Sequence, residues 1–347
     1  MRRGTFMMKL AWVIVPAMLL LVGCTASLPQ KTAIDHYVAG QLLMEQGDYE
    51  AALAELREAV RADSSLSVAH CAAGDIYRKQ GNLELARRSY EDACGANPYA
   101  FKPHYNLGVV YQSIAEADKK IESVKANLLK AVEAYVRAIT IQSGDFDANL
   151  NLSVCYYQLE KYDLAEQYCK AAIEIDAKSG AAYSNLGIIY DCQGRLYDAI
   201  SAYKASLEID THQGEILLNL GSTYMRQGRL KQAVNTFELA SKELPEHSAP
   251  WEQIAACHFH LGQEQQAFEA YQKATSLNAK SSVAHRGLGV IYMTQFLRDR
   301  NQTTLRDQAL EEWNTSLEIQ PNQPDLIKLV EKYRPKPITQ PTVADNS

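Results

Sequence analysis

Residues 180–213, GAAYSNLGIIYDCQGRLYDAISAYKASLEIDTHQ, contain the pattern that decides the fold of this chain. Two small residues, Gly187 and Ala199, lie 12 positions apart, and a tyrosine follows each of them within four residues. Two helices approach closely only where side chains are small, and large rings then fill the space beside the crossing. The stretch therefore predicts two antiparallel helices joined by a tight turn at Gly194, because glycine readily supplies a positive φ.

The same pattern recurs along most of the chain. The first small position is occupied, at steps of 34, 34, 45, 34, 34, 34 and 34 residues, by Gly40, Gly74, Gly108, Ser153, Gly187, Gly221, Ala255 and Gly289. One hairpin cannot cover its own apolar face, so repeated hairpins stack and share a continuous core. The sequence predicts an all-α fold of eight hairpins, here called units 1 to 8, over 33–66, 67–100, 101–145, 146–179, 180–213, 214–247, 248–281 and 282–323.

Two units break the regular spacing. Unit 3 carries 11 extra residues between Tyr111 and Ala131, and unit 8 carries 8 between Tyr292 and Ala309. Eleven residues are about three helical turns, so both helices could lengthen without rotating their core faces. We expect either a projecting helical finger or a simple surface elongation. In unit 4, Glu160 stands where other units have the turn glycine.

The repeated pattern resembles the tetratricopeptide repeat (TPR) family over residues 33 to about 322. That resemblance implies a right-handed α-solenoid in which the first helix of each unit lines a concave groove. The amphipathic stretch 324–334 resembles the capping helix of such solenoids, and 335–347 is expected to be a loose tail. The family implies binding of a partner protein or an extended peptide in the groove.

The first 23 residues have the features of an export signal. Three basic residues precede an apolar run over 10–22, which at 13 residues is shorter than the ~20 that a spanning helix needs. The run ends in Leu-Val-Gly followed by Cys24, which resembles the bacterial lipobox. The alternative is an ordinary signal, or an uncleaved anchor with a chance cysteine.

The lipobox resemblance implies cleavage before Cys24 and acylation of its thiol and new amino group, with 24–32 as a tether. Acyl chains of this kind hold a chain on a membrane without a spanning segment. We expect a bacterial envelope protein, and Thr25 in place of an aspartate favours the outer membrane, facing the periplasm. The combination is similar to envelope TPR lipoproteins, including pilotins that assist type IV pilus or secretion machines.

One position of the predicted groove is uniform in units 3 to 6. It is occupied by Asn106, Asn151, Asn185 and Asn219, each two residues before the small residue. An asparagine amide can pair with both the N–H and the C=O of an extended peptide, whatever the peptide's side chains. The row resembles the asparagine ladder of the TPR superhelix in O-linked N-acetylglucosamine transferase; alternatively, the asparagines are helix-surface residues without a ligand. Further candidates for peptide contact are Tyr105, Tyr157 and Arg226.

No catalytic or metal site is predicted. Four histidines share one repeat position and are interpreted as packing residues: His36, His70, His104 and His285. Phosphate-binding loops, nucleophile elbows and HExxH motifs are absent from the sequence. We therefore expect no cofactor and no small-molecule substrate, and the alternative of a periplasmic enzyme is disfavoured. The net charge of −6 makes nucleic acid an unexpected partner.

Six cysteines follow Cys24 in the sequence. Export to an oxidising compartment would let Cys71 pair with Cys94, or Cys155 with Cys169, each pair joining the two helices of one unit. Cysteine is equally suited to a small core position. Both alternatives remain open from the sequence.

Overall fold

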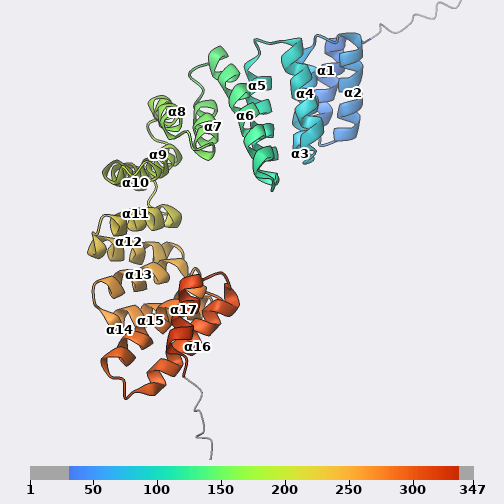
Figure 1. The fold of residues 1–347 in the computed structure, drawn as a ribbon. Coiled ribbons are helices and arrows are strands. Elements are labelled where there is room, and N and C mark those ends of the chain that lie inside the picture. The colour runs from blue at the N-terminus through green and yellow to red at the C-terminus, as the bar shows by residue number, and fades with distance from the viewer. Residues whose placement is uncertain (1–30, 336–347) are drawn as a thin grey trace, which may run out of the picture.

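The structure is a computed structural model that describes residues 31–335. In that range the regular structure is entirely helical and forms eight hairpins followed by a single helix (Figure 1). The hairpins are α1 (Ala33–Glu45) with α2 (Tyr49–Ala62), α3 (Ser67–Lys79) with α4 (Leu83–Ala96), α5 (Phe101–Ala117) with α6 (Ile121–Ile141), α7 (Phe146–Gln158) with α8 (Tyr162–Ile175), α9 (Gly180–Cys192) with α10 (Leu196–Ile209), α11 (Gly214–Arg226) with α12 (Leu230–Glu243), α13 (Ala249–His260) with α14 (Glu264–Leu277), and α15 (Ser282–Arg298) with α16 (Thr303–Ile319). The last helix is α17 (Pro324–Tyr333). The predicted all-α solenoid is confirmed; the proposed signal, Cys24 and most of the tether and tail lie outside the described residues.

The tight turns within the units depend on a left-handed backbone. Five turn glycines have φ between 73° and 82°: Gly47, Gly81, Gly194, Gly228 and Gly262. In unit 4, Glu160 adopts φ 59° and is the non-glycine residue with positive φ in the described range. The turn geometry is therefore kept in unit 4 even though the residue that favours it is missing.

Close helix crossings explain the small-residue period. In five units the glycine of the first helix lies directly against a ring of the second helix: Gly74 on Tyr90, Gly108 on Tyr135, Gly187 on Tyr203, Gly221 on Phe237, and Gly289 on Trp313. Each of these rings is at most 1% exposed. The rings fill the space that the glycines leave, and this contact fixes the distance between the helices of a unit.

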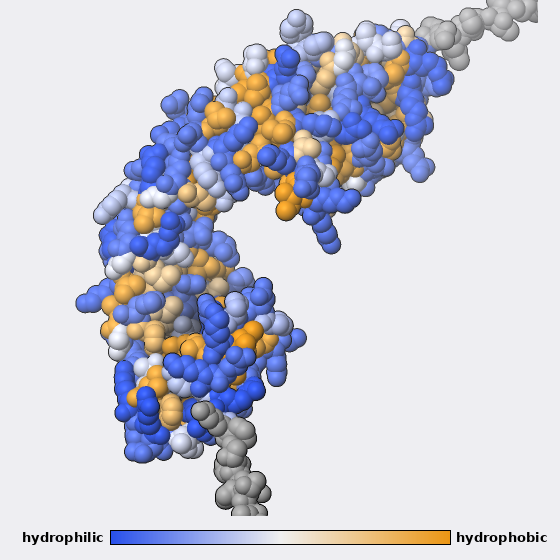
Figure 2. All heavy atoms as spheres, viewed as in Figure 1, coloured by the Kyte–Doolittle hydropathy of each residue, from blue (hydrophilic) through white to orange (hydrophobic). Residues whose placement is uncertain are grey.

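The first helices form the inner row of the array. From α1 to α15, each first helix contacts the next first helix, whereas no second helix in the described range contacts the next second helix. The units are thus closer together on the first-helix side, which bends the array into the arc of Figure 1. Figure 2 shows the same arc enclosing a hollow, with hydrophobic side chains gathered over α5 and α6.

Both inserts lengthen helices. α5 and α6 have 17 and 21 residues, against 13 and 14 in α3 and α4, which accounts for all 11 extra residues of unit 3. This hairpin extends beyond its neighbours in Figure 1. In unit 8, α15 and α16 have 17 residues each. Among the described helices, none combines the length and apolar character needed to cross a bilayer.

The apolar core is divided into three clusters. A central cluster runs from unit 2 to unit 8, and a separate N-terminal cluster joins α2 and α3 through Leu53, Leu56 and Ile76. At the other end, Leu326 and Val330 of α17 pack with Trp313 in a third cluster. α17 therefore covers the C-terminal end of the solenoid with an apolar face.

Candidate functional site

The inner row of first helices carries the predicted asparagine ladder. Asn151 of α7, Asn185 of α9 and Asn219 of α11 are each half-buried. The side-chain amides of Asn185 and Asn219 make no hydrogen bond to any residue that the structure describes, whereas an amide on a bound chain would offer both a donor and an acceptor. These two positions are the part of the row that is open to a ligand.

A small cavity lies beside Asn185, between α7 and α9. Its volume is about 140 Å³, and it is lined by Ser153, Val154, Tyr157, Gln158, Asn185, Ile188 and Ile189. Two of the predicted site residues, Tyr157 and Asn185, are thereby brought together. The cavity combines an amide that has no hydrogen-bond partner with aliphatic walls, and this mixture of polar and apolar groups is typical of ligand pockets.

Asn106 differs from the other members of the row. It is 6% exposed, and its Nδ2 donates to Asp75 Oδ1 at 2.9 Å. The same Oδ1 accepts from the hydroxyl of Tyr90 at 2.6 Å, and Asp75 Oδ2 accepts from Lys102 Nζ at 2.8 Å. Asp75 of the preceding unit therefore already binds the Asn106 amide, and contact between Asn106 and a peptide stays a prediction.

Tyr105 and Asn151 connect units 3 and 4 in the groove. Asn151 Nδ2 donates to the Tyr105 hydroxyl at 3.4 Å, and the Tyr105 ring stacks on Phe101 with centroids 5.7 Å apart. Burial, together with the charges of Asp147 and Asp145, raises the pKa of Tyr105. The hydroxyl thus keeps its proton, which remains available for donation to a ligand.

The other two predicted residues have partners within the chain. The pKa of Tyr157 is raised mainly by burial and secondly by its contact with Cys192. The Tyr157 hydroxyl oxygen lies 3.9 Å from Cys192 Sγ. Arg226 Nη1 lies 2.5 Å from Asp191 Oδ2, so its charge is compensated. Arg226 is therefore a bridge between α9 and α11 rather than an open cation.

The repeated histidines lie between the first helix and the preceding loop. Three of them reach a carbonyl six residues earlier, with Nε2 to oxygen distances of 3.3, 3.0 and 3.1 Å, for His70 to Ser64, His104 to Pro98 and His285 to Ala279. His36 Nδ1 instead lies 2.6 Å from Glu55 Oε2. Within residues 31–335, no cluster of three or more His, Cys, Asp or Glu side chains is arranged to hold a metal ion.

The six cysteines of the solenoid are free thiols in this structure. Burial raises the pKa of Cys71, Cys94 and Cys155 to about 12, and that of Cys169 and Cys257 to about 11. These thiols are protonated at neutral pH and serve as small core side chains. Neither proposed pair, Cys71 with Cys94 or Cys155 with Cys169, is bonded.

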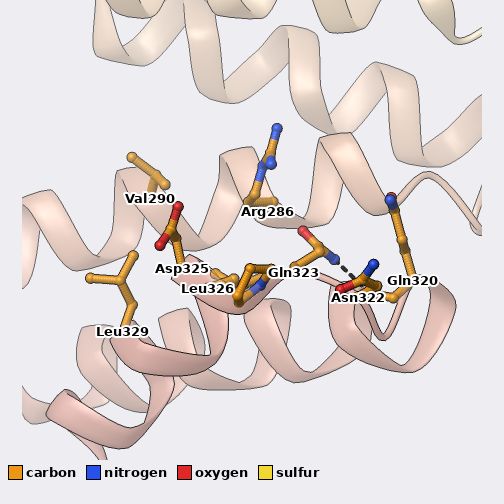
Figure 3. Close-up of a pocket in the computed structure, with 9 residues that line it drawn as sticks. Arg286, Val290, Gln320, Asn322, Gln323, Asp325, Leu326 and Leu329 are labelled. Carbon is orange, nitrogen blue, oxygen red and sulfur yellow. Dashed lines mark hydrogen bonds between the residues drawn. The ribbon is translucent and has the colours of Figure 1, made fainter.

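A second cavity, which the sequence analysis missed, lies where α17 meets α15 (Figure 3). Its volume is about 350 Å³, and its lining includes Arg286, Val290, Gln323, Asp325 and Leu329. Figure 3 shows Arg286 pointing away from α17, while Gln323 donates to the backbone oxygen of Gln320 at 2.9 Å. Arg286 occupies the repeat position of Tyr105, and Val290 that of Ile188, so extending the period to unit 8 would have identified both.

Comparison with known proteins agrees with this geometry. Family models described as tetratricopeptide repeat match residues 37–101, 144–212, 193–257 and 249–281. The chain belongs to the tetratricopeptide repeat family. The residues outside the matches include most of units 3 and 8, the two TPR units with lengthened helices.

Solved TPR structures show the same fold. The chain is 18% identical to pilF of Pseudomonas aeruginosa, with 64% of this chain and 96% of that chain covered and a TM-score of 0.50. A tetratricopeptide repeat protein from Parabacteroides merdae is also 18% identical, with 75% and 98% covered and a TM-score of 0.50. At this identity the likeness concerns the solenoid fold alone.

One curated relative shares a stretch of the repeats. Small glutamine-rich tetratricopeptide repeat-containing protein 2 of Mycosarcoma maydis is 34% identical over 97 residues, which are 26% of this chain. The match spans 28% of the length of that relative. As in TPR proteins generally, the role indicated by the family is protein interaction.

Proposed function

We propose that this protein is a non-catalytic adaptor that binds an extended segment of a partner polypeptide along α7, α9 and α11. The observation that carries the proposal is the unbonded amide of Asn185 beside a cavity of about 140 Å³ with aliphatic and aromatic walls. Asn219 continues the row one unit further. Repeat-spaced amides suit a ligand whose own donors and acceptors are regularly spaced, which is the backbone of an extended chain.

The chemistry of the site also favours an adaptor over an enzyme. The buried thiols near the row have raised pKa values, and the cation Arg226 is paired with Asp191. A nucleophile needs a lowered pKa or an adjacent base, and neither accompanies Cys155 or Cys169. Backbone recognition needs only the amides and hydroxyls that the row contains.

A backbone-modified peptide tests the mode of binding. Peptides selected from a phage-displayed random library against the purified protein would be resynthesised with N-methyl groups at successive backbone amides. We expect Asn185→Ala and Asn219→Ala each to weaken the Kd about tenfold, the cost of one lost hydrogen bond. N-methylation at the matching peptide amides should cost a similar factor. The matched control is Asn314→Ala, at an exposed position of α16.

Two results would contradict this mode of binding. One is an unchanged Kd for the Asn185→Ala, Asn219→Ala double variant. The other is equal binding of the N-methylated and unmodified peptides, which would place recognition in peptide side chains rather than in the backbone.

We further propose that the chain is held on the bacterial outer membrane, facing the periplasm, by acylation of Cys24. This proposal is supported by the lipobox sequence and by the short segment between Cys24 and α1. The test is the mass of the N-terminal peptide from membranes of an expressing bacterium. We expect a diacyl or triacyl adduct on Cys24, and loss of membrane sedimentation in Cys24→Ala. An unmodified, uncleaved N-terminus would contradict it.

A pilotin-like role in assembling a type IV pilus or secretion machine is a narrower form of the same proposal. The combination of a lipobox with a peptide-binding solenoid favours it, because such a factor must hold a client chain close to the outer membrane. Deletion in a producing organism should then reduce secretin multimers in that membrane. Normal secretin assembly would exclude the narrower role and leave the adaptor proposal intact.

A further inference from the structure

One position of the second helix supplies the side chain that packs beside the small residue of the first helix. In six units this side chain is a ring: Tyr90, Tyr135, Tyr203, Phe237, Tyr271 and Trp313. In unit 1 it is Leu56, and in unit 4 it is Cys169, which is fully buried. Unit 4 also has Ser153 where units 2, 3, 5, 6 and 8 have a glycine. Unit 4 therefore lacks the large side chain that the other units place at this crossing.

Unit 3 shows where such a ring lies. A Cβ added at Gly108 would come within 2.6 Å of Tyr135 Cε1, and the Tyr135 hydroxyl donates to Gln112 Oε1 at 3.1 Å. The Tyr135 ring thus extends from Gly108 toward Gln112 along α5. In unit 4 the residues at these two repeat positions are Ser153 and Tyr157.

The cavity beside Asn185 lies at this same place in unit 4. Ser153 and Tyr157 both line it, together with their neighbours Val154 and Gln158 on α7. The surrounding side chains have thus not closed the space that a ring fills in unit 3. We call this space the unit 4 cavity, and its complete lining is Ser153, Val154, Tyr157, Gln158, Asn185, Ile188 and Ile189.

The unit 4 cavity opens toward the groove. All of its lining residues lie on α7 and α9, which belong to the inner row of first helices. Ser153 and Ile189 are at most 1% exposed and form its floor, whereas Gln158 is exposed at its mouth. The Ser153 hydroxyl donates to the carbonyl oxygen of Leu150 at 2.9 Å, so its proton is already used. A group that enters from the groove therefore meets mainly hydrocarbon.

The volume of the unit 4 cavity matches one aromatic ring. It is about 140 Å³, and an apolar protein cavity of roughly 150 Å³ holds a benzene molecule. A bound water would need about two to four polar partners, and a charged group would lose its hydration without gaining an opposite charge. An apolar ring satisfies both the size and the chemistry of the cavity.

We propose that a partner polypeptide bound along the groove inserts the side chain of one phenylalanine into the unit 4 cavity. The ring takes the place that Tyr135 takes in unit 3, but it enters from the groove instead of from the second helix. This inference rests on the proposed binding of an extended segment along α7, α9 and α11, and it names an anchor residue of that segment. Asn185 at the edge of the cavity is then placed to bond the backbone beside the anchor.

Methyl NMR of the full chain, labelled at the isoleucine δ1 methyl groups, tests occupancy of the unit 4 cavity directly. The probe is N-acetyl-phenylalanine methylamide. We expect ring-current shifts of the Ile188 and Ile189 methyl signals that saturate as the probe concentration rises. The matched control is Ile291, at the repeat position of Ile189, because Tyr271 already packs against the neighbouring Gly287 there. The Ile291 signal should not shift, and N-acetyl-alanine methylamide should shift none of the three.

Filling the cavity from inside gives a second test. Ser153→Gly combined with Cys169→Phe recreates the pair that Gly221 and Phe237 form in unit 6. We expect this double variant to melt at the same temperature as the unchanged protein or higher, and to lose the probe-induced shifts. Ile188→Ala is an independent variant that removes part of one wall. It should weaken probe binding at least about threefold, whereas Val290→Ala, at the same repeat position in unit 8, should not.

Peptides selected from the random library extend the test to a polypeptide ligand. We expect those that bind the unchanged protein to share one phenylalanine. Replacement of that phenylalanine by alanine should weaken the Kd at least about tenfold, and the double variant should bind both forms equally.

Three results would overturn the proposal. One is the absence of probe-induced shifts at Ile188 and Ile189 up to the solubility limit of the probe. Another is the persistence of these shifts in the folded double variant or their full retention in Ile188→Ala. The third is peptide binding that depends on Asn185 but not on an aromatic residue, which would refute the phenylalanine anchor and leave the proposed function intact. Peptide binding that ignores Asn185→Ala would instead count against the proposed function.

Discussion

Gly187 of α9 lies so close to Tyr203 of α10 that a Cβ added at Gly187 would come within 2.5 Å of the Tyr203 ring atoms Cδ1 and Cε1. The ring is 1% exposed, so it lies within the packed core. The separation of the two helices is therefore set by the absence of a single side-chain atom.

Gly187→Ala should destabilise unit 5 by about 1–3 kcal/mol, the usual cost of forcing extra volume into a packed core. Urea unfolding followed by hydrogen exchange of α9 and α10 would measure it. The matched control is Gly95→Ala in α4, where an added Cβ meets nothing within 4 Å. That change should be neutral or stabilising by up to about 1 kcal/mol, since alanine is the better helix former. Equal effects of the two substitutions would refute the close-packing argument.

Glu160→Gly should raise the melting temperature. Glu160 has φ 59°, a conformation that costs an L-residue roughly 1 kcal/mol and costs glycine nothing sterically. The gain is reduced by the entropy that glycine loses on folding, so we expect about 0.5 kcal/mol. The reverse change, Gly194→Glu in the equivalent turn of unit 5, should destabilise by about 1 kcal/mol. A melting temperature lowered by Glu160→Gly would contradict the prediction.

Acid should weaken the contact between units 4 and 5 through Glu166 of α8. Burial raises the pKa of Glu166, but hydrogen bonds from Lys170, Arg195 and Gln193 outweigh it, and the net shift is downward from 4.5. A carboxyl whose pKa is lower in the folded chain stabilises the fold above its unfolded pKa and loses that contribution as the pH falls through the folded value. We expect Glu166→Gln to flatten the fall in melting temperature below about pH 4.5.

The control for this acid effect is Glu174→Gln, also on α8, whose exposed carboxylate has no ion pair in the described range. Its acid dependence should equal that of the unchanged protein. If both variants show the same pH profile, the contacts of Glu166 do not contribute to acid sensitivity.

Cys192 should be alkylated faster than the other five cysteines of the solenoid. Cys192 is exposed, whereas the other cysteines of the solenoid have pKa values of about 11 to 12. Because only the thiolate reacts, iodoacetamide at about pH 8 should modify Cys192 at least about 100-fold faster than the others. Mass analysis of peptides at successive times would show the order in which the cysteines are modified. Denaturation without a reductant should then expose five reactive thiols; a pair that reacts only after reduction would identify a disulfide.

Much of the fold could be predicted because it repeats. The spacing of Gly187, Ala199 and Tyr203 predicts a close crossing of two helices. The same spacing in the other units predicts the same crossing there. The 11 extra residues of unit 3 likewise became additional helix in α5 and α6, since a length near three full turns preserves the core face.

The candidate site was less predictable, because contacts between units decide it. Asn106 and Asn185 occupy the same repeat position, but only Asn106 has an Asp75 in the preceding unit to bind its amide. The repeat pattern describes what the units have in common. It does not show which single unit carries a charged residue, such as Asp75, beside the asparagine of the next unit.

The division of the core into three clusters has a mechanical consequence. If the chain is pulled from residue 32, the load reaches α1 and α2 before the central cluster, and their apolar contacts are separate from it. The first hairpin would then give way under tension while the asparagine row stayed folded. Unfolding of this hairpin would lengthen the segment before the solenoid by tens of residues, while Asn151, Asn185 and Asn219 would stay in place.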